Sequence, residues 1–320
     1  MERTRVSRRE FLGASALAAG LATAAPGAPQ PPQETRPMKV KFGLNLLVYS
    51  AAFTKDDVHL IKKVADMGYD GVEILFADLG ILDTKATRKA CEEAKMGLTA
   101  CCVMVPEANP CSPKPDVRKA AVERLKQMVD ICAEMGGEAI AGPLYAPVRE
   151  LTGKAPTDDE RKWCADALRA AAEHADKAKI NVAIEPLNRF ETYVVTTIGD
   201  AAKMCKAVDH PRLKVQVDTF HANIEERDTA ASIRACGPLV GHFHACENDR
   251  GTPGTGHVPW KEVFAALKDI QYDRWVTIES FATGILDLCA AACIWRPIYD
   301  SADKLAKDGL AFLKRMAAEA

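Results

Sequence analysis

Val182–Glu185 reads VAIE, Lys214–Asp218 reads KVQVD and Val276–Glu279 reads VTIE. Each is a short run rich in β-branched residues that ends in a carboxylate. Apolar runs of four to eight residues are typical of strands buried on both faces. These three acids are therefore expected at the carboxyl ends of buried strands.

Eight such runs recur after residue 38, and helical segments separate them. The expected strands are Val40–Leu47, Gly71–Phe76, Leu98–Val103, Glu138–Gly142, Asn181–Glu185, Lys214–Asp218, Val240–Ala245 and Trp275–Glu279. The expected helices include Asp56–Met67, Val117–Met135, Asp158–Lys179, Ile198–Val208 and Trp260–Ile270. Glycines at Met67-Gly68, Met96-Gly97 and Met135-Gly136 are expected to end helices in the left-handed conformation.

This alternation predicts the fold class. Alternating strands and helices indicate an α/β protein with a parallel sheet. Eight repeats in about 280 residues favour a closed (β/α)8 TIM barrel, a single domain over residues 39–320. The segment Leu47–Ser50 after the first strand contains no glycine, so the glycine-rich turn of a dinucleotide-binding fold is missing. The chain carries 42 Lys+Arg and 44 Asp+Glu, a net charge of −2, which gives no general basic field for nucleic acid.

The first 38 residues have the composition of an export signal. Ser7–Leu12 reads SRREFL, and an Ala/Gly/Leu run extends from Gly13 to Ala25. Residues 1–25 resemble a twin-arginine signal peptide, and the proline-rich residues 26–38 are expected to be a disordered linker. The resemblance implies the twin-arginine machinery as a partner and a periplasmic or otherwise exported location. The apolar run is too short to span a bilayer, so no stable membrane insertion is expected, whether the signal is cleaved or kept as a tether.

The eleven cysteines include no C-x-x-C pair, so neither a zinc ribbon nor a small disulfide scaffold is indicated. Several lie in apolar stretches, namely Cys101, Cys102, Cys132, Cys164 and Cys205. Buried free thiols are the expected state, because free cysteine packs as a small hydrophobe. Disulfides are the alternative.

Four neighbouring strands have candidate metal ligands at their carboxyl ends. These are Glu185, Asp218, His244 and Glu279. Active sites of TIM barrels lie at this rim, and buried carboxylates need a compensating charge. The alternative is four separate caps or salt bridges. Three carboxylates and one imidazole suit Mn²⁺, Mg²⁺ or Co²⁺ better than a structural Zn²⁺. His242 is expected to face away from His244 and to have a packing or supporting role.

Four segments resemble one enzyme group. They are VAIEPLNRFE at 182–191, KVQVDTFHANIEE at 214–226, GHFHACENDRGTPGTGHVPW at 241–260 and IESF at 278–281. They resemble the D-tagatose 3-epimerase / D-psicose 3-epimerase group of the xylose isomerase-like sugar-phosphate isomerase/epimerase barrels. The likeness covers nearly the whole chain after residue 38. Pro143–Tyr145 and Leu47–Tyr49 depart from the group's aromatic pattern, so the pocket for the far end of the sugar is expected to differ.

The resemblance implies a role for each candidate residue. Glu185, Asp218, His244 and Glu279 would bind one divalent metal ion per subunit, most simply Mn²⁺. Glu185 and Glu279 would also be the catalytic acid and base. Glu191, His221 and Arg250 would hold substrate oxygens, Phe281 would form an apolar wall, and Cys101-Cys102 would resemble a similar wall pair. A homodimer or homotetramer is implied as well.

The implied reaction is epimerisation of free ketoses at C3 through a metal-stabilised enediolate. The proton leaves one face and returns on the other, so two bases are needed. Glu185 and Glu279 follow strands three steps apart, about 135° around an eight-stranded ring. Arg250 begins a Gly-rich tight turn that is expected to bring it over the site.

Several alternatives stay open at this point. Another sugar isomerase, of the hydroxypyruvate or aldose–ketose type, could use the same ligands. A lyase or hydratase acting on 3-keto-glycosides also begins with an enolate. A three-zinc DNA-repair nuclease is disfavoured because only seven histidines occur. A sugar-binding protein without turnover would be expected to lack a ligand.

Overall fold

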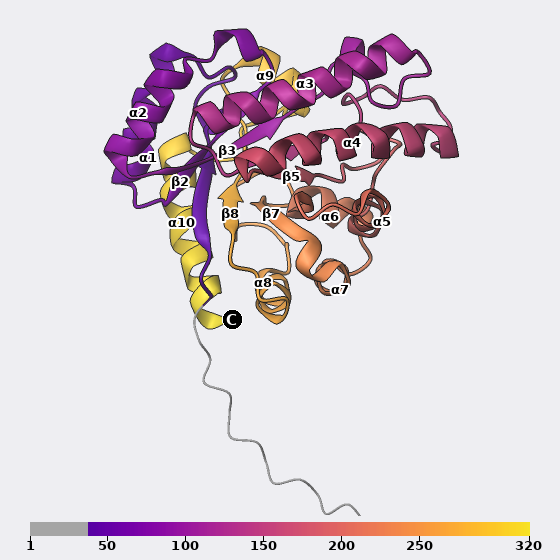
Figure 1. Ribbon diagram of the computed structural model, residues 1–320. Coiled ribbons are helices and arrows are strands. Elements are labelled where there is room, and N and C mark those ends of the chain that lie inside the picture. The colour runs from indigo at the N-terminus through magenta and orange to yellow at the C-terminus, as the bar shows by residue number, and fades with distance from the viewer. Residues whose placement is uncertain (1–37) are drawn as a thin grey trace, which may run out of the picture. The chain divides into compact units, whose positions relative to one another are not determined.

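The computed structural model describes residues 38–320 (Figure 1). The expected signal peptide and nearly all of the expected linker lie outside the described residues. The described chain forms a closed barrel of parallel strands in the order β1 to β8, which confirms the predicted TIM barrel. The strands are β1 Lys41–Asn45, β2 Gly71–Phe76, β3 Gly97–Cys102, β4 Ala139–Gly142, β5 Asn181–Ile184, β6 Leu213–Asp218, β7 Val240–Ala245 and β8 Trp275–Ile278.

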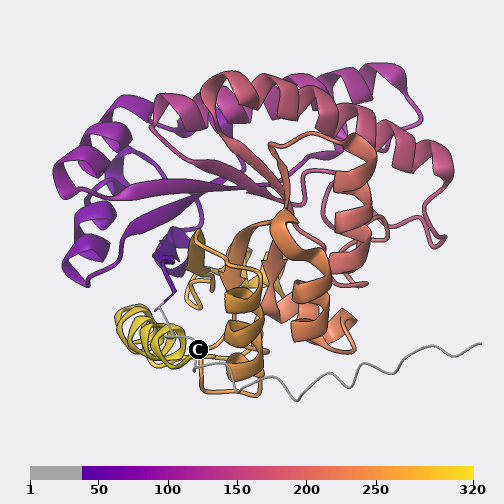
Figure 2. The same cartoon turned by 60° about the horizontal axis from the view of Figure 1, so that its bottom comes forward.

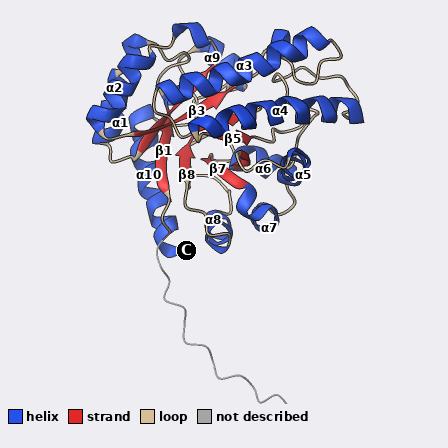
Figure 3. Ribbon diagram, viewed as in Figure 1, coloured by secondary structure: helices blue, strands red, loops and turns tan. Residues whose placement is uncertain are grey.

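Helices surround the strands, as the colours of Figure 3 make plain. The α-helices are α1 His59–Asp66, α2 Thr84–Ala94, α3 Pro115–Glu134, α4 Asp158–Ala178, α5 Ile198–Val208, α6 Thr219–Glu225, α7 Thr229–Cys236, α8 Trp260–Asp269, α9 Leu286–Ala292 and α10 Ala302–Glu319. Short 3₁₀ helices are η1 Leu46–Val48, η2 Lys55–Asp57, η3 Leu79–Ile81, η4 Pro106–Ala108 and η5 Gly237–Leu239. The long helices α3 and α4 lie side by side in Figures 1 and 2. No described helix is both long enough and apolar enough to span a bilayer.

The expected first strand, Val40–Leu47, is too long. The side chain of Asn45 accepts a hydrogen bond from the Leu47 backbone and so begins η1, which ends the strand at Asn45. The other seven expected strands agree with the structure to within one residue at each end.

Two of the three glycine predictions are confirmed. Gly68 and Gly136 have φ values of 88° and 76° after α1 and α3. Gly97 is different, because Lys95 (φ 56°) already ends α2 in the left-handed conformation. Gly97 begins β3, where the ring of Trp275 would collide with a Cβ atom. Its glycine is therefore needed for close packing and not for a turn.

All eleven cysteines lie in the described part of the chain and are free thiols, and every one except Cys293 is buried.

Candidate active site

The four candidate ligands converge at the carboxyl ends of β5 to β8. Glu185 follows β5, Asp218 ends β6, His244 lies in β7 and Glu279 follows β8. All four are buried, and one ligand atom from each falls within 4.8 Å of the others. From His244 Nδ1, the nearest oxygens of Glu279, Asp218 and Glu185 are 3.4, 3.7 and 3.9 Å away. The structure therefore brings together the four residues that the sequence analysis proposed as ligands.

The donor set fits a divalent cation. Glu185 Oε1 is buried and has no hydrogen-bond partner among the described residues. Burial, and next the charge of Asp218, raise the pKa of Glu185 well above its usual range. A cation would compensate for both effects, and hard carboxylate oxygens are the ligands that Mg²⁺ and Mn²⁺ prefer. Gln216 Nε2 lies 2.9 Å from His244 Nδ1, so a cation bound to that nitrogen would displace this contact.

Arg250 lies directly against the carboxylates. Its Nη1 donates to Asp218 Oδ2 (2.8 Å) and Glu279 Oε2 (2.7 Å), and its Nη2 lies 3.1 Å from His221 Nε2. Burial opposes ionisation of Asp218, yet the charges of Arg250 and His221 hold its pKa well below the usual range. Arg250 has a left-handed backbone (φ 64°), consistent with the expected tight turn.

Glu247, which the sequence analysis did not select, organises the loop that carries Arg250. This buried carboxylate accepts hydrogen bonds from Gly254 N (2.7 Å), Val258 N (3.0 Å) and Trp260 Nε1 (3.0 Å). A Cβ atom on Gly256 would lie 2.7 Å from the Glu247 side chain. The available signal in the sequence was an acid two residues after the end of β7, the strand that carries His244.

Glu73 was also missed. This fully buried acid in β2 lies 2.7 Å from His244 Nε2 and 2.7 Å from His242 Nε2. It also accepts hydrogen bonds from Asn45 Nδ2 (2.9 Å) and Thr99 Oγ1 (2.8 Å). Burial opposes its ionisation, but the two histidines hold its pKa well below the usual range. Glu73 thus directs Nε2 of His244 inward and leaves Nδ1 facing the three carboxylates.

The expectation for His242 was wrong. Side chains on a strand alternate with a period of two, so His242 and His244 point to the same side. Both rings contact Glu73, and their centroids are 5.2 Å apart. The other part of the expectation, a supporting role, agrees with the position of His242 next to the candidate ligand His244.

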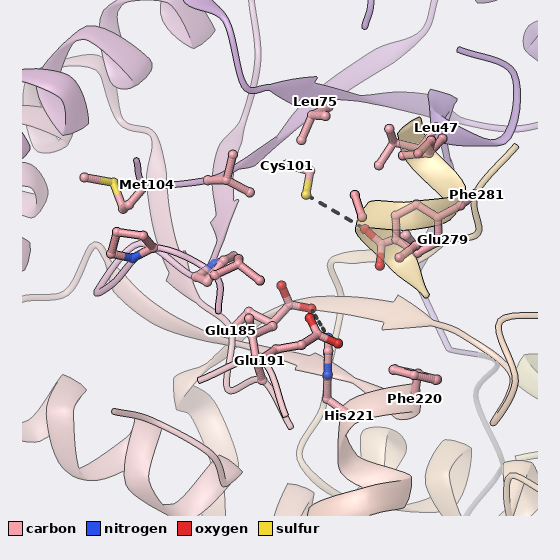
Figure 4. A pocket seen from close by; sticks show the side chains of 18 of the residues that line it. Leu47, Leu75, Cys101, Met104, Glu185, Glu191, Phe220, His221, Glu279 and Phe281 are labelled. Atoms are coloured by element: carbon pink, nitrogen blue, oxygen red, sulfur yellow. Dashed lines mark hydrogen bonds and ion pairs between the residues drawn. The ribbon is translucent and has the colours of Figure 1, made fainter. Parts of the chain in front are cut away.

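A cavity of about 350 Å³ opens above these residues, and Figure 4 shows the view into it. The expected substrate contacts Glu191, His221, Arg250 and Phe281 all line it. Asn188 Nδ2 donates to Glu191 (2.8 Å), and Asn188 N donates to His221 Nδ1 (3.1 Å). Of the expected wall pair, Cys101 lines the cavity, whereas Cys102 is directed away, with its thiol toward the Ala100 carbonyl.

The cavity has a polar half and an apolar half. Its charged or imidazole side chains all come from segments after β5 to β8. The wall formed by β2 and by the segments after β1, β3 and β4 includes Leu47, Leu75, Val103, Met104, Pro106 and Pro147. Figure 4 shows Leu75 and Met104 across the cavity from Glu191 and His221. The thiol of Cys101 is the only polar side chain on that apolar wall within the described residues. Of the segments Leu47–Tyr49 and Pro143–Tyr145, where a departure was expected, Leu47 and Pro143 lie in this wall.

Comparison with known proteins agrees with the fold and the site. The sequence matches the family described as "Xylose isomerase-like TIM barrel" over residues 61–316. A "Probable ketose 3-epimerase" of Synechocystis sp. is 31% identical over 277 residues, 87% of this chain and 96% of that protein. A "D-psicose 3-epimerase" of Ruminiclostridium cellulolyticum is 31% identical over 83% of this chain and 92% of its own length.

A solved structure is similar as well. The crystal structure of a D-allulose 3-epimerase from Methylomonas sp. in complex with D-allulose superposes with a TM-score of 0.83 at 29% identity, over 88% of this chain and 98% of that one. The chain belongs to the xylose isomerase-like TIM barrel family, and within it to the group of ketose 3-epimerases. It is an enzyme of the isomerase and epimerase class.

Proposed function

We propose that this protein is a divalent-metal-dependent epimerase that inverts C3 of a free ketose. One observation carries the proposal. Glu185 and Glu279, which come from strands on different sides of the rim, both reach one buried histidine–carboxylate centre and both line the cavity. Two carboxylates on different sides of a substrate are what removal and return of a proton on opposite faces requires.

The residues of the chain would divide the work as follows. Glu279 is held by Arg250 and, at 3.3 Å, by Asn45, so its carboxylate has a fixed direction. Glu185 faces the cavity from the β5 side, and its partnerless Oε1 is free for a cation or a substrate proton. Arg250 supplies a positive charge for oxygens of the substrate, and Glu191 accepts a hydrogen bond from a hydroxyl group of the substrate.

The cofactor is the second part of the proposal. Glu185, Asp218, His244 and Glu279 would hold one divalent cation, Mn²⁺ in the simplest case. When bound, such a cation stabilises the negative charge that develops on the oxygens of the enediolate. With a cation bound there, the pKa of Glu185 would fall, and this carboxylate could act as a base near neutral pH.

Isotope exchange tests the reaction. The Mn²⁺-loaded protein is incubated with D-fructose or D-tagatose in deuterated water, and the sugars are analysed by NMR. Deuterium at C3 together with the C3 epimer is the expected result. Deuterium at C1 would favour an aldose–ketose isomerase instead. Absence of exchange from both sugars would contradict the proposal.

A second candidate is favoured by the apolar half of the cavity. Among residues 38–320, the only hydrogen-bonding side chain there for the hydroxyl groups of a free sugar is the Cys101 thiol. A 3-keto-glycoside with an apolar aglycone would fill this half without burying hydroxyl groups, and a lyase or hydratase would act on it. Incubation with 4-nitrophenyl 3-keto-glucoside, with the released 4-nitrophenolate measured at 400 nm, distinguishes this activity from ketose epimerisation.

We further propose export through the twin-arginine route and assembly as a homodimer or homotetramer. The SRREFL segment at 7–12 supports export, and the exposed Phe190 and Trp295 give apolar surface for a subunit contact. Replacement of Arg8 and Arg9 by lysine should leave the protein in the cytoplasmic fraction of the producing bacterium. Light scattering coupled to gel filtration measures the assembly.

A further inference from the structure

Two buried cysteines far apart in the sequence lie in direct contact. Cys111 lies in the segment between η4 and α3, and Cys164 lies on α4, 53 residues later. Their sulfur atoms are 2.7 Å apart. Atoms in van der Waals contact normally stay about 3.5–4.0 Å apart, whereas a disulfide bond is about 2.05 Å long. No other pair of sulfurs in the described chain is in hydrogen-bond contact.

The same backbone atom anchors both thiols. Cys111 and Cys164 each donate to the carbonyl oxygen of Tyr145, at 3.3 and 3.2 Å. The hydroxyl of Tyr145 in turn donates to the backbone carbonyl of Glu185 (2.9 Å). Tyr145, in the loop after β4, therefore links the cysteine pair to the backbone of Glu185, a candidate catalytic residue.

We propose that Cys111 and Cys164 form a disulfide when the folded protein meets an oxidising environment. The oxidant is a small disulfide such as oxidised glutathione. One cysteine thiolate attacks it to give a mixed disulfide and releases one thiol. The second cysteine thiolate then displaces the second thiol and closes the Cys111–Cys164 bond. The two cysteines lose two electrons and two protons, and the oxidant gains them as two thiols.

The structure indicates how the oxidant would reach the two thiols and how fast the exchange would be. Neither sulfur is exposed, so exchange proceeds through local opening of the segment between η4 and α3. Opening would break the hydrogen bonds from Asn109 Nδ2 to Glu150 (2.9 Å) and from Arg118 Nη1 to Ser112 O (2.7 Å), which hold this buried segment to the rest of the chain. The contact with Cys111, together with burial, raises the pKa of the Cys164 thiol, so exchange is slow at neutral pH.

The crosslink would fix one wall of the cavity. Val105 and Pro106 precede Cys111, and Pro147 and Val148 follow Tyr145, and all four line the cavity. Met104 and Pro147 already form an isolated bridge between these two segments. A bond between Cys111 and Cys164 would join the first segment to α4, which follows the second. This consequence does not depend on which sugar reaction the enzyme performs.

Mass spectrometry tests the bond directly. The full chain, purified with reductant, is transferred to oxidised glutathione at about pH 8.5, and free thiols are then alkylated in denaturant. Besides the exposed Cys293, which can carry a glutathione, the expected protein has two unreacted cysteines, and a digest contains one crosslinked pair of peptides with Cys111 and Cys164. Recovery of both residues as alkylated thiols, or a crosslink between other cysteines, would overturn the proposal.

Thermal unfolding supplies a second readout with a matched control. Closing a 53-residue loop restricts the unfolded chain, so oxidation should raise the Tm of the wild type by roughly 5–10 °C. Oxidation also removes the two weak hydrogen bonds from the thiols to the Tyr145 carbonyl, and this loss offsets only a small part of the gain in stability. Cys111→Ala and Cys164→Ala should show no shift on oxidation. Cys132→Ala should keep the full shift, because Cys132 is buried with its thiol on a carbonyl but has no sulfur partner. A shift that persists in Cys164→Ala would contradict the assignment.

Discussion

At the scale of single residues, Glu279 is the clearest test of proton transfer. Its carboxylate is fixed by Arg250 and Asn45, so replacement by the isosteric amide keeps the shape and removes the base. We expect Glu279→Gln to lower kcat by about 10²- to 10⁴-fold. Steady-state kinetics at saturating Mn²⁺ measures the loss, and metal analysis checks that the ion is still bound.

The control for this variant is Glu262→Gln, which changes an exposed acid on α8. It should keep wild-type kinetics. Turnover by Glu279→Gln close to that of the control would remove Glu279 from the proton-transfer role.

Glu73 acts through His244 as a positioning residue. Its carboxylate contacts the imidazole nitrogen that faces away from the candidate ligands. Glu73→Gln should weaken Mn²⁺ binding by about 10- to 100-fold, while kcat at saturating Mn²⁺ falls much less. Titration calorimetry and kinetics at several Mn²⁺ concentrations separate the two effects. Wild-type Mn²⁺ affinity in the variant would show that the contact is only structural, and exposed Glu123→Gln is the control.

Glu185, Asp218 and Glu279 could be found in the sequence because each comes at the end of an apolar run, and His244 because it lies one residue before the end of β7. Glu73 could not be found in the same way, because it lies inside a strand and its partners come from strands β1, β3 and β7. Such a contact depends on the closure of the barrel, which a local pattern does not contain. The error on His242 had a different cause, since strand alternation already places it beside His244.

At the scale of elements, the start of α4 links helix stability to pH. Thr157 and Glu160 form a capping box, and Tyr193 donates to Glu160 (2.6 Å). Burial opposes ionisation of Glu160, but these hydrogen bonds lower its pKa below the ordinary 4.5. A lowered folded-state pKa stabilises the fold above the unfolded-state value, and that stabilisation is lost as the pH falls through the folded-state value.

Glu160→Gln should therefore lower the free energy of unfolding by about 0.3–1 kcal/mol at pH 7. The difference from wild type should shrink as the pH falls below 4.5. Urea unfolding at several pH values measures it. Glu173→Gln, an exposed change further along the same helix, should show no such difference at any pH. A difference that grows toward acid would contradict this account.

The ends of helices and strands were predictable where a polar residue caps a helix and has no other role. They were hard to predict where the capping residue is also a candidate ligand. The strand β6 and the helix α5 were expected almost as observed. The short helix α6 was not expected, because it begins directly after the candidate ligand Asp218. The side chain of Asp218 caps it by accepting hydrogen bonds from Phe220 N and His221 N. One carboxylate thus both positions His221 and faces the candidate metal site.

At the scale of the whole molecule, the proposed cation should contribute to stability. Three buried carboxylates converge there, and a ligand that binds only the folded state stabilises it by about 2.7 kcal/mol at one hundred times its Kd. Chelation and dialysis should therefore lower Tm by several degrees and abolish turnover. Re-addition of Mn²⁺ should restore both, as calorimetry and kinetics would show. Undiminished turnover after chelation would contradict the metal-dependent mechanism.

The overall architecture was predictable because it depends on a repeated local pattern. Eight alternations of strand and helix limit the possible sheets, and the absence of glycine after β1 argued against the open form. The apolar wall of the cavity was less predictable. It is assembled from loops after β1 to β4 and from α9, and no single segment of the sequence shows which side chains will face the same space.

The position of Glu73 in the centre of the barrel has one more consequence. Its four partners come from opposite sides of the ring, so the innermost layer of packing and the chemistry at the rim share one set of atoms. Substitution of Thr99 or Asn45 in that layer would be detected first as reduced binding of the proposed cation, well before the protein unfolds. Screens that score only solubility would overlook such changes.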